Sequence, residues 1–139
     1  MKKIINNINL IELKALAKEI ASSLKVGDVL CLYGDLGTGK TTFSGMLINS
    51  LIDTPQNITS PTFNLVHTYD SPKGQIWHFD MYRLKSAEEA YEIGIEDALM
   101  HAISIIEWPE IVEPLLPQER VSIHFSHNSK GEFCISLEK

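Results

Sequence analysis

The sequence predicts an α/β fold, a three-layer sandwich in which a mostly parallel central sheet carries additional antiparallel strands. Two patterns along the chain support this class. Short apolar runs typical of strands alternate with stretches whose apolar residues recur at helical spacing. A polar turn at residues 70–74 separates two strand-like segments, which indicates a hairpin. The 139 residues suit a single domain, 1–139, with one sizeable core.

The first half of the chain starts with an expected edge strand and an amphipathic helix. Apolar residues at 13, 16, 17, 20, 21 and 24 share one helical face, with Asn9 as N-cap and Gly27 as the stop. Residues 28–33 are apolar enough for a buried strand. In order, the expected elements are a strand at 3–8, a helix at 10–24, a strand at 28–33, a helix at 40–51 and strands at 62–69 and 75–80.

The second half of the chain continues the alternation. Ser86 with Glu89 three residues later predicts a capped helix start, and Gly94 interrupts that helical region before it ends near residue 101. Pro109 is expected to open a short helix that ends before Pro114. Strands are expected at 102–106, 120–125 and 132–137, the last two joined by a polar turn.

Composition limits the class of protein. Hydrophobic residues make up 44% and charged residues 22%, as in an ordinary globular protein. The 12 basic and 18 acidic residues give a net charge of −6, which argues against nucleic-acid binding by bulk charge. A local basic patch, or a nucleic acid held by a partner, stays open. No signal peptide or membrane span is expected, and Cys31 and Cys134 suit reduced core thiols, so we expect a cytoplasmic protein.

A glycine-rich motif provides the main functional signal. Residues 34–41 are Gly-Asp-Leu-Gly-Thr-Gly-Lys-Thr, a complete P-loop placed between an expected strand and an expected helix. Glycines let backbone N–H groups surround an anion, and the following helix adds its N-terminal partial charge. Lys40 would neutralise the β- and γ-phosphates, and the Thr41 hydroxyl would bind Mg²⁺. The sequence therefore predicts a P-loop NTPase-like fold that holds a nucleoside triphosphate with Mg²⁺.

Two acidic residues end apolar strand segments. Asp80 follows Ile76-Trp77-His78-Phe79, and Glu107 follows residues 102–106. Ligands of parallel α/β sheets lie beyond the carboxyl ends of the strands, so both acids are expected near the phosphates. Asp80 best fits the metal shell. Glu107 fits the positioning of the attacking water or a second metal contact, although spacing does not divide these roles.

Several further segments, taken with the P-loop, resemble a known family. They are Ser60-Pro61-Thr62-Phe63, His78-Phe79-Asp80-Met81-Tyr82-Arg83-Leu84, Glu88-Glu89 with Gly94, and Ile106-Glu107-Trp108-Pro109-Glu110. In this order and spacing they resemble the TsaE (YjeE) family of bacterial ATPases, over nearly the whole chain. Thr38 and Met81 stand where Ala and Leu are usual, and the C-terminal end is short for the family.

The resemblance implies an ATPase subunit for synthesis of threonylcarbamoyladenosine in tRNA. Such a subunit acts with the transferase TsaD and its partner TsaB, meets tRNA only through that complex, and hydrolyses ATP weakly alone. Carried over by motif, Thr42, Asp80 and Glu107 are positions important for hydrolysis, and Thr62 lies in a switch-like loop. The implied ATP contacts are Gly34, Asp35, Leu36, Gly37, Thr38, Gly39, Lys40, Thr41, Thr42 and Thr62, and the implied Mg²⁺ ligands are Thr41, Asp80 and Glu107. For the base pocket the sequence suggests Ile8, Asn9, His127 and Asn128.

Two other functions compete with this interpretation. A small-molecule kinase usually has a lid with several arginines, whereas this chain has only Arg83 and Arg120. A non-enzymatic nucleotide switch of the GTPase type would need an Asn-Lys-x-Asp segment to select guanine, which the sequence lacks. The histidines at 67, 78, 101, 124 and 127 have no metal-binding spacing, so surface or hydrogen-bonded roles are expected for them.

Overall fold

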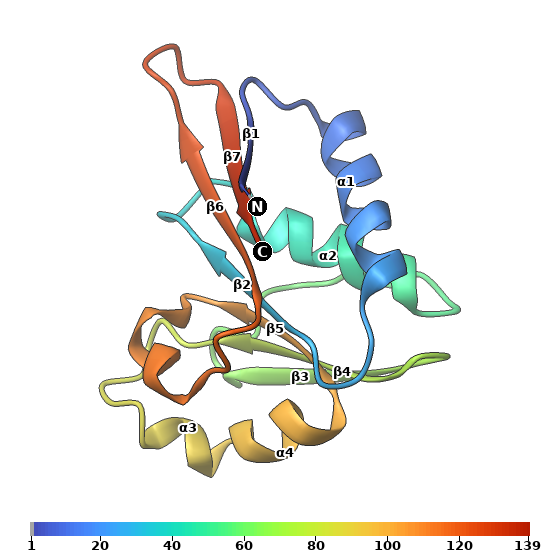
Figure 1. Ribbon diagram of the computed structural model, residues 1–139, viewed down its shortest axis with the longest axis vertical. Coiled ribbons are helices and arrows are strands. Elements are labelled where there is room, and N and C mark those ends of the chain that lie inside the picture. Colours follow the sequence, from blue (N-terminus) through green and yellow to red (C-terminus); the bar gives the residue numbers. More distant parts are fainter. Residues whose placement is uncertain (1) are drawn as a thin grey trace.

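The computed structural model describes residues 2–139 as one seven-stranded mixed sheet with helices on both faces (Figure 1). The strand order is β1-β7-β6-β2-β5-β4-β3. The central strands β6, β2, β5 and β4 pair in parallel, and the β3–β4, β6–β7 and β1–β7 pairs are antiparallel. The predicted α/β class, with antiparallel strands added to a parallel centre, is confirmed.

The elements are β1 (Lys2–Ile5), α1 (Leu10–Ser23), β2 (Val29–Tyr33), α2 (Lys40–Leu51), β3 (Val66–Ser71), β4 (Gly74–Asp80), α3 (Glu89–Glu92), α4 (Ile95–His101), β5 (Ile103–Glu107), the 3-10 helix η1 (Pro109–Leu115), β6 (Val121–His127) and β7 (Phe133–Glu138). No helix in the described part of the chain is long and apolar enough to cross a membrane.

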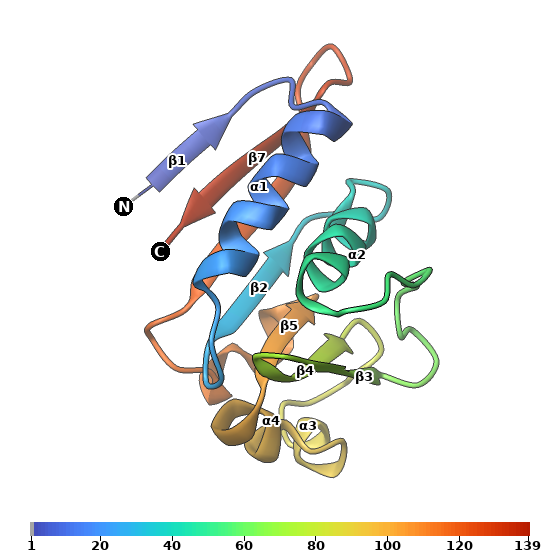
Figure 2. The same cartoon turned by 90° about the vertical axis from the view of Figure 1, so that its right-hand side faces the viewer.

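Strand β2 lies in the middle of the sheet and is buried on both faces. Leu30 and Leu32 point into the core beneath α1 and α2, whereas Val29 and Cys31 point into the core beneath α3, α4 and η1. Figure 2 shows α1 and α2 side by side over one face of the sheet. Because β2 is held from both faces and by two neighbouring strands, the loop after it starts from a rigid base.

Two elements start later than predicted. β3 starts at Val66, not Thr62, because residues 62–64 form a turn that ends at Leu65 with φ of 68°. The helix expected from Ser86 starts at Glu89. The Glu89 carboxylate accepts the backbone N–H groups of Lys85 and Ser86, but the Ser86 hydroxyl makes no capping bond. These N–H groups lower the pKa of Glu89.

The ends of two more elements, η1 and β1, differ from the prediction for local reasons. η1 continues through Pro114 to Leu115, since a 3-10 turn avoids the clash with the i−4 carbonyl that excludes proline from an α-helix. β1 ends at Ile5 because Asn7 has φ of 53° and turns the chain into α1. There the predicted Asn9 cap is confirmed as a capping box with Glu12.

Candidate nucleotide-binding site

The P-loop connects the end of β2 to the start of α2. Gly34, Gly37 and Gly39 have φ of 142°, 77° and 102°, values that other residues rarely adopt. No side chain caps the first turn of α2, so the turn presents uncapped N–H groups and the positive end of the helix dipole to the loop. The predicted strand–loop–helix setting is confirmed, and it forms an anion-binding arrangement.

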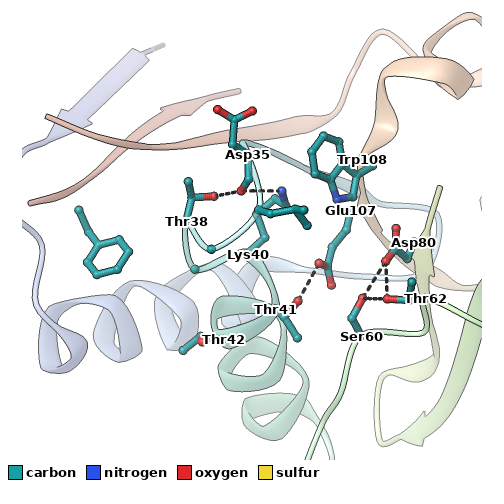
Figure 3. A pocket seen from close by; sticks show the side chains of 14 residues that line it. Asp35, Thr38, Lys40, Thr41, Thr42, Ser60, Thr62, Asp80, Glu107 and Trp108 are labelled. Atoms are coloured by element: carbon teal, nitrogen blue, oxygen red, sulfur yellow. Dashed lines mark hydrogen bonds between the residues drawn. The ribbon is translucent and has the colours of Figure 1, made fainter. Parts of the chain in front are cut away.

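Lys40 lies buried inside this loop, with 5% of its surface exposed. Its Nζ donates to the backbone carbonyls of Gly34 and Asp35, the latter at 3.1 Å, and sits 3.8 Å from the centre of the Trp108 ring (Figure 3). Burial lowers the pKa of Lys40, while nearby carboxylates, Glu107 foremost, act in the opposite direction. All three partners of the ammonium are therefore neutral groups, and none of them balances its charge.

Glu107 is the carboxylate that contacts the P-loop helix. Its Oε1 accepts from the Thr41 hydroxyl at 3.0 Å, and its Oε2 lies 2.5 Å from His78 Nε2 and 3.4 Å from the Ser44 hydroxyl. Both Glu107 and His78 are almost fully buried. The sheet produces this contact, because Glu107 is the register partner of Leu32 near the end of β2.

Asp80 lies one strand further along, as the register partner of Glu107 on β4. Its Oδ2 accepts from the hydroxyls of Ser60 at 2.8 Å and Thr62 at 3.1 Å, and its Oδ1 accepts from the Tyr82 backbone N–H at 3.0 Å. Asp80 therefore ties the Ser60–Phe63 loop to the end of the parallel sheet. Figure 3 shows the Asp80 cluster beside Glu107, on the same side of the P-loop.

These groups surround a pocket of about 340 Å³. It is lined by P-loop residues 35–42 together with Ser60, Thr62, Asp80, Glu107, Trp108 and Phe133. The prediction that both strand-end acids project toward the phosphate loop is confirmed. The side chains at the pocket are oxygen-rich and cationic, which suits a phosphate chain with a metal ion.

A second, apolar pocket of about 590 Å³ adjoins the first. The two share Thr38, Gly39, Thr42 and Phe133, and the rest of the second lining comes from residues 8–11, Leu13, Phe125 and Ile135. Its lining includes Ile8 and Asn9, two of the residues that the sequence suggested for a base pocket.

His127 and Asn128 do not line this pocket. The His127 ring packs on Phe133 with ring centres 4.7 Å apart, and the Asn128 side chain bonds to Glu132 in the β6–β7 turn. These two residues, suggested for a base pocket, therefore lie outside the second pocket, whose C-terminal lining comes from residues of β6 and β7 and not from the turn between them.

The donor set can be compared with what Mg²⁺ requires. Thr41, Glu107 and Asp80 offer hydroxyl and carboxylate oxygens at adjacent strand and helix ends. Mg²⁺ prefers such oxygens and usually takes only one or two carboxylates, with water and phosphate completing its octahedron. No group of three or more His, Cys, Asp or Glu residues suited to a metal occurs among residues 2–139. The residues present thus suit a metal shared with a phosphate, not a metal held by protein alone.

The structure brings most of the predicted residues together but separates Thr42 from the acids. Figure 3 shows Thr42 turned away from Glu107, and Thr42 lines both pockets at their junction. Sequence reasoning missed His78, Ser44 and Ser60 as members of the site. For His78 a signal existed, since the alternation of strand residues 76–80 places it on the same face as Asp80.

Comparison with known proteins agrees with this geometry. The sequence model of the family "Threonylcarbamoyl adenosine biosynthesis protein TsaE" matches residues 8–133. A Rickettsia prowazekii protein named tRNA threonylcarbamoyladenosine biosynthesis protein TsaE is 46% identical over 128 residues, covering 92% of this chain and 89% of that protein. The Bacillus subtilis protein of the same name is 38% identical over 117 residues, covering 84% and 72% of the two chains.

A solved structure has the same fold. The crystal structure of Bacillus subtilis YdiB superposes with a TM-score of 0.74 at 31% sequence identity, covering 99% of this chain and 84% of that one. The sequence match spans both the P-loop and the two acidic strand ends, and the structural match spans the whole sheet. On these grounds the chain belongs to the TsaE family.

Proposed function

We propose that this chain is an ATP-binding, Mg²⁺-dependent ATPase subunit that serves threonylcarbamoyladenosine formation in tRNA. Family membership and the names of the relatives support the role in that biosynthesis. The observation that carries the ATPase proposal is the contact of the Glu107 carboxylate with the Thr41 hydroxyl at the N-terminus of α2, beside the P-loop. A buried carboxylate at this place suits a phosphate-bound metal and has no comparable use in an ordinary glycine-rich turn.

Phosphate binding would begin with Lys40. Its present partners, two carbonyls and the Trp108 ring, are neutral groups, whereas the β- and γ-phosphates are anionic. An anionic phosphate would add an attraction between opposite charges that the neutral carbonyls lack, so the ammonium would turn toward the phosphates. The backbone N–H groups of the loop and of the first turn of α2 would complete the cradle. Thr42, at the junction of the two pockets, would contact the phosphate nearest the nucleoside.

Thr41 and Glu107 would hold Mg²⁺, with Asp80 close to its water shell. When bound, Mg²⁺ would supply positive charge that neutralises the negative charge developing on the leaving group. Glu107 is better placed for the metal than Asp80, because its Oε1 is directly on Thr41. This is the reverse of the division that the sequence alone favoured.

Asp80 would then act on the attacking water. It stands in the Ser60–Thr62 cluster, one strand away from Glu107. Water attacks the γ-phosphorus, the bond to the β-γ bridging oxygen breaks, and ADP and inorganic phosphate leave. Asp80 would orient the water, and the position of Thr62 would depend on whether the γ-phosphate is present. Thr62 precedes Phe63, whose side chain is 87% exposed, so loss of the γ-phosphate would change a surface that a partner can touch.

The apolar pocket next to the P-loop would take the adenine base. Phe125, Phe133 and Ile135 supply apolar contact area, and Asn9 adds a polar group at the rim. Adenine is flat and largely apolar on its faces, so aliphatic and aromatic walls suit it.

TsaD-like and TsaB-like subunits would be the partners, and tRNA would be met only through the assembled complex. The chain's net charge of −6 supports the second point, because direct tRNA binding draws on a basic surface. A nucleotide-driven change at Thr62 and Phe63 would give the ATPase a means of resetting those partners.

ATP turnover by the pure chain, with and without the two partner subunits, tests this proposal. We expect slow Mg²⁺-dependent release of phosphate alone and faster release with the partners. Lys40→Ala should abolish nucleotide binding, and Asp80→Asn should bind Mg-ATP but hydrolyse it poorly. Efficient phosphate transfer to a metabolite would instead favour a kinase, and nucleotide binding with no hydrolysis in the presence of both partners would favour a switch.

A further inference from the structure

His78 is a buried histidine where the apolar core meets the buried Glu107 carboxylate. It lies on β4 between Ile76 and Asp80 on the face covered by α2, and its side chain has no exposed surface. Its Nε2 lies 2.5 Å from Glu107 Oε2, whereas its Nδ1 has no hydrogen-bond partner among the described residues. Burying a polar ring with one nitrogen unpaired costs free energy, so a packing role alone does not account for histidine at this position.

The two carboxylate oxygens of Glu107 have different partners. Oε2 is bound on the core side by His78 Nε2, whereas the nearby Ser44 hydroxyl, 3.4 Å away, donates to the Lys40 carbonyl at 3.0 Å. Oε1 is left on the pocket side with Thr41. His78 therefore holds the carboxylate plane from the core side, and one lone-pair direction of Oε1 remains available to a metal.

We propose that His78 is a positioning residue that orients Glu107 so that a single oxygen, Oε1, faces a divalent metal bound with the nucleotide. This inference rests on the proposed Mg-ATP site and adds a residue to it. His78 touches neither nucleotide nor metal and acts only through Glu107. Partners of this kind restrict a ligand to the geometry that Mg²⁺ demands, and their loss typically costs about 10- to 100-fold in metal affinity.

The effect of His78 on metal affinity can be measured directly. Electron paramagnetic resonance reports how tightly Mn²⁺ binds to the full chain in the presence of a non-hydrolysable ATP analogue. We expect His78→Leu to weaken Mn²⁺ affinity about 10- to 100-fold. The affinity for the analogue without metal, measured in EDTA, should stay within about 2-fold, because the P-loop contacts are unchanged. His78→Gln keeps an N–H donor close to the place of Nε2 and should recover most of the Mn²⁺ affinity.

Ile76→Ala is the matched control for damage to the core. Ile76 is fully buried on the same strand and face, two residues before His78, and has no polar contact with the site. It should lower thermal stability at least as much as His78→Leu without a comparable loss of Mn²⁺ affinity. If His78→Leu does not fold, His78→Ala against Ile76→Ala still tests the point, since both truncate a buried β4 side chain and only the former removes the donor to Glu107.

The outcomes separate this inference from the proposal on which it rests. If the wild-type chain binds no Mn²⁺ with the analogue, or if Glu107→Gln binds it normally, the proposed metal site is wrong and the inference falls with it. If Glu107→Gln loses the metal while His78→Leu keeps it, the site stands and the role of His78 is refuted. If His78→Leu and Ile76→Ala lose Mn²⁺ affinity equally, His78 acts only through packing and the proposal is refuted.

Discussion

Replacing Gly34 by alanine should distort the phosphate loop far more than the same change at Gly37. A Cβ on Gly34 would lie 2.6 Å from the Phe125 carbonyl oxygen and 2.8 Å from Thr38 Oγ1. Ordinary C···O contacts are no closer than about 3.3 Å, so the backbone of β6 or of the loop must move by roughly 0.7 Å. A Cβ on Gly37 would meet nothing within 4 Å, which makes Gly37→Ala the matched control.

The magnitudes follow from the two costs involved. Both glycines have positive φ, 142° at Gly34 and 77° at Gly37, which costs alanine about 1–2 kcal/mol. At Gly34 the overpacking against strand β6 adds about 1–3 kcal/mol. We therefore expect Gly34→Ala to lower the free energy of unfolding by about 2–5 kcal/mol and Gly37→Ala by about 1–2 kcal/mol.

Urea unfolding of the nucleotide-free protein, followed by circular dichroism, measures both values. A lower midpoint with an unchanged slope would report a change in stability and not in the denatured state. The reasoning is refuted if Gly34→Ala is no less stable than Gly37→Ala, since the two then differ in neither strain nor contact. A crystal structure of Gly34→Ala with β6 unmoved would refute it as well.

Four further predictions concern Lys73, Cys31 and Trp108. Lys73 Nζ donates to three carbonyls at the end of α1, those of Ala21, Ser22 and Leu24, at 2.9–3.0 Å, so Lys73→Met should cost about 1–2 kcal/mol in thermal unfolding, and an unchanged melting temperature would contradict this. Burial raises the pKa of the Cys31 thiol to about 12, so iodoacetamide at pH 8 should label the native protein slowly at Cys31 and unfolded protein quickly. The same shift should reduce stability as the pH rises from about 9 toward 12, because only the unfolded thiol then loses its proton; a Cys31→Ala variant with an identical alkaline profile would count against this. Binding of a Mg²⁺–ATP analogue should change the emission of Trp108, because Lys40 leaves its ring; the change should persist in Trp77→Phe and vanish in Trp108→Phe.

The sequence by itself determined the local chemistry of the nucleotide site. Helix α2 begins and ends where it was predicted, at Lys40 and Leu51, because a glycine-rich loop permits an abrupt helix start and the apolar residues 43, 47, 48 and 51 bury one helical face. The β3–β4 hairpin and the positions of Asp80 and Glu107 at strand ends were predictable for the same reason. Each depends on residues close together in the chain, and the period of the side chains encodes the face on which they lie.

The tertiary structure alone decided which of these groups touch. Strand order places β5 directly beside β2, so Glu107 and not Asp80 reaches Thr41, and no spacing in the sequence encodes that order. Tertiary contacts also overrode local preference at Thr62, because its hydroxyl is bound to Asp80 and the segment turns where its residue types favour a strand.

His78 illustrates both what the sequence predicts and what only the tertiary structure decides. The sequence showed a histidine alternating with apolar residues and predicted no more than a hydrogen bond for it. Its partner, Glu107, lies 29 residues away on a neighbouring strand, and the contact exists only because β4 and β5 run parallel with Asp80 opposite Glu107. Local patterns determined the kinds of side chain present at the phosphate site, and the order and register of the sheet determined how they are arranged around it.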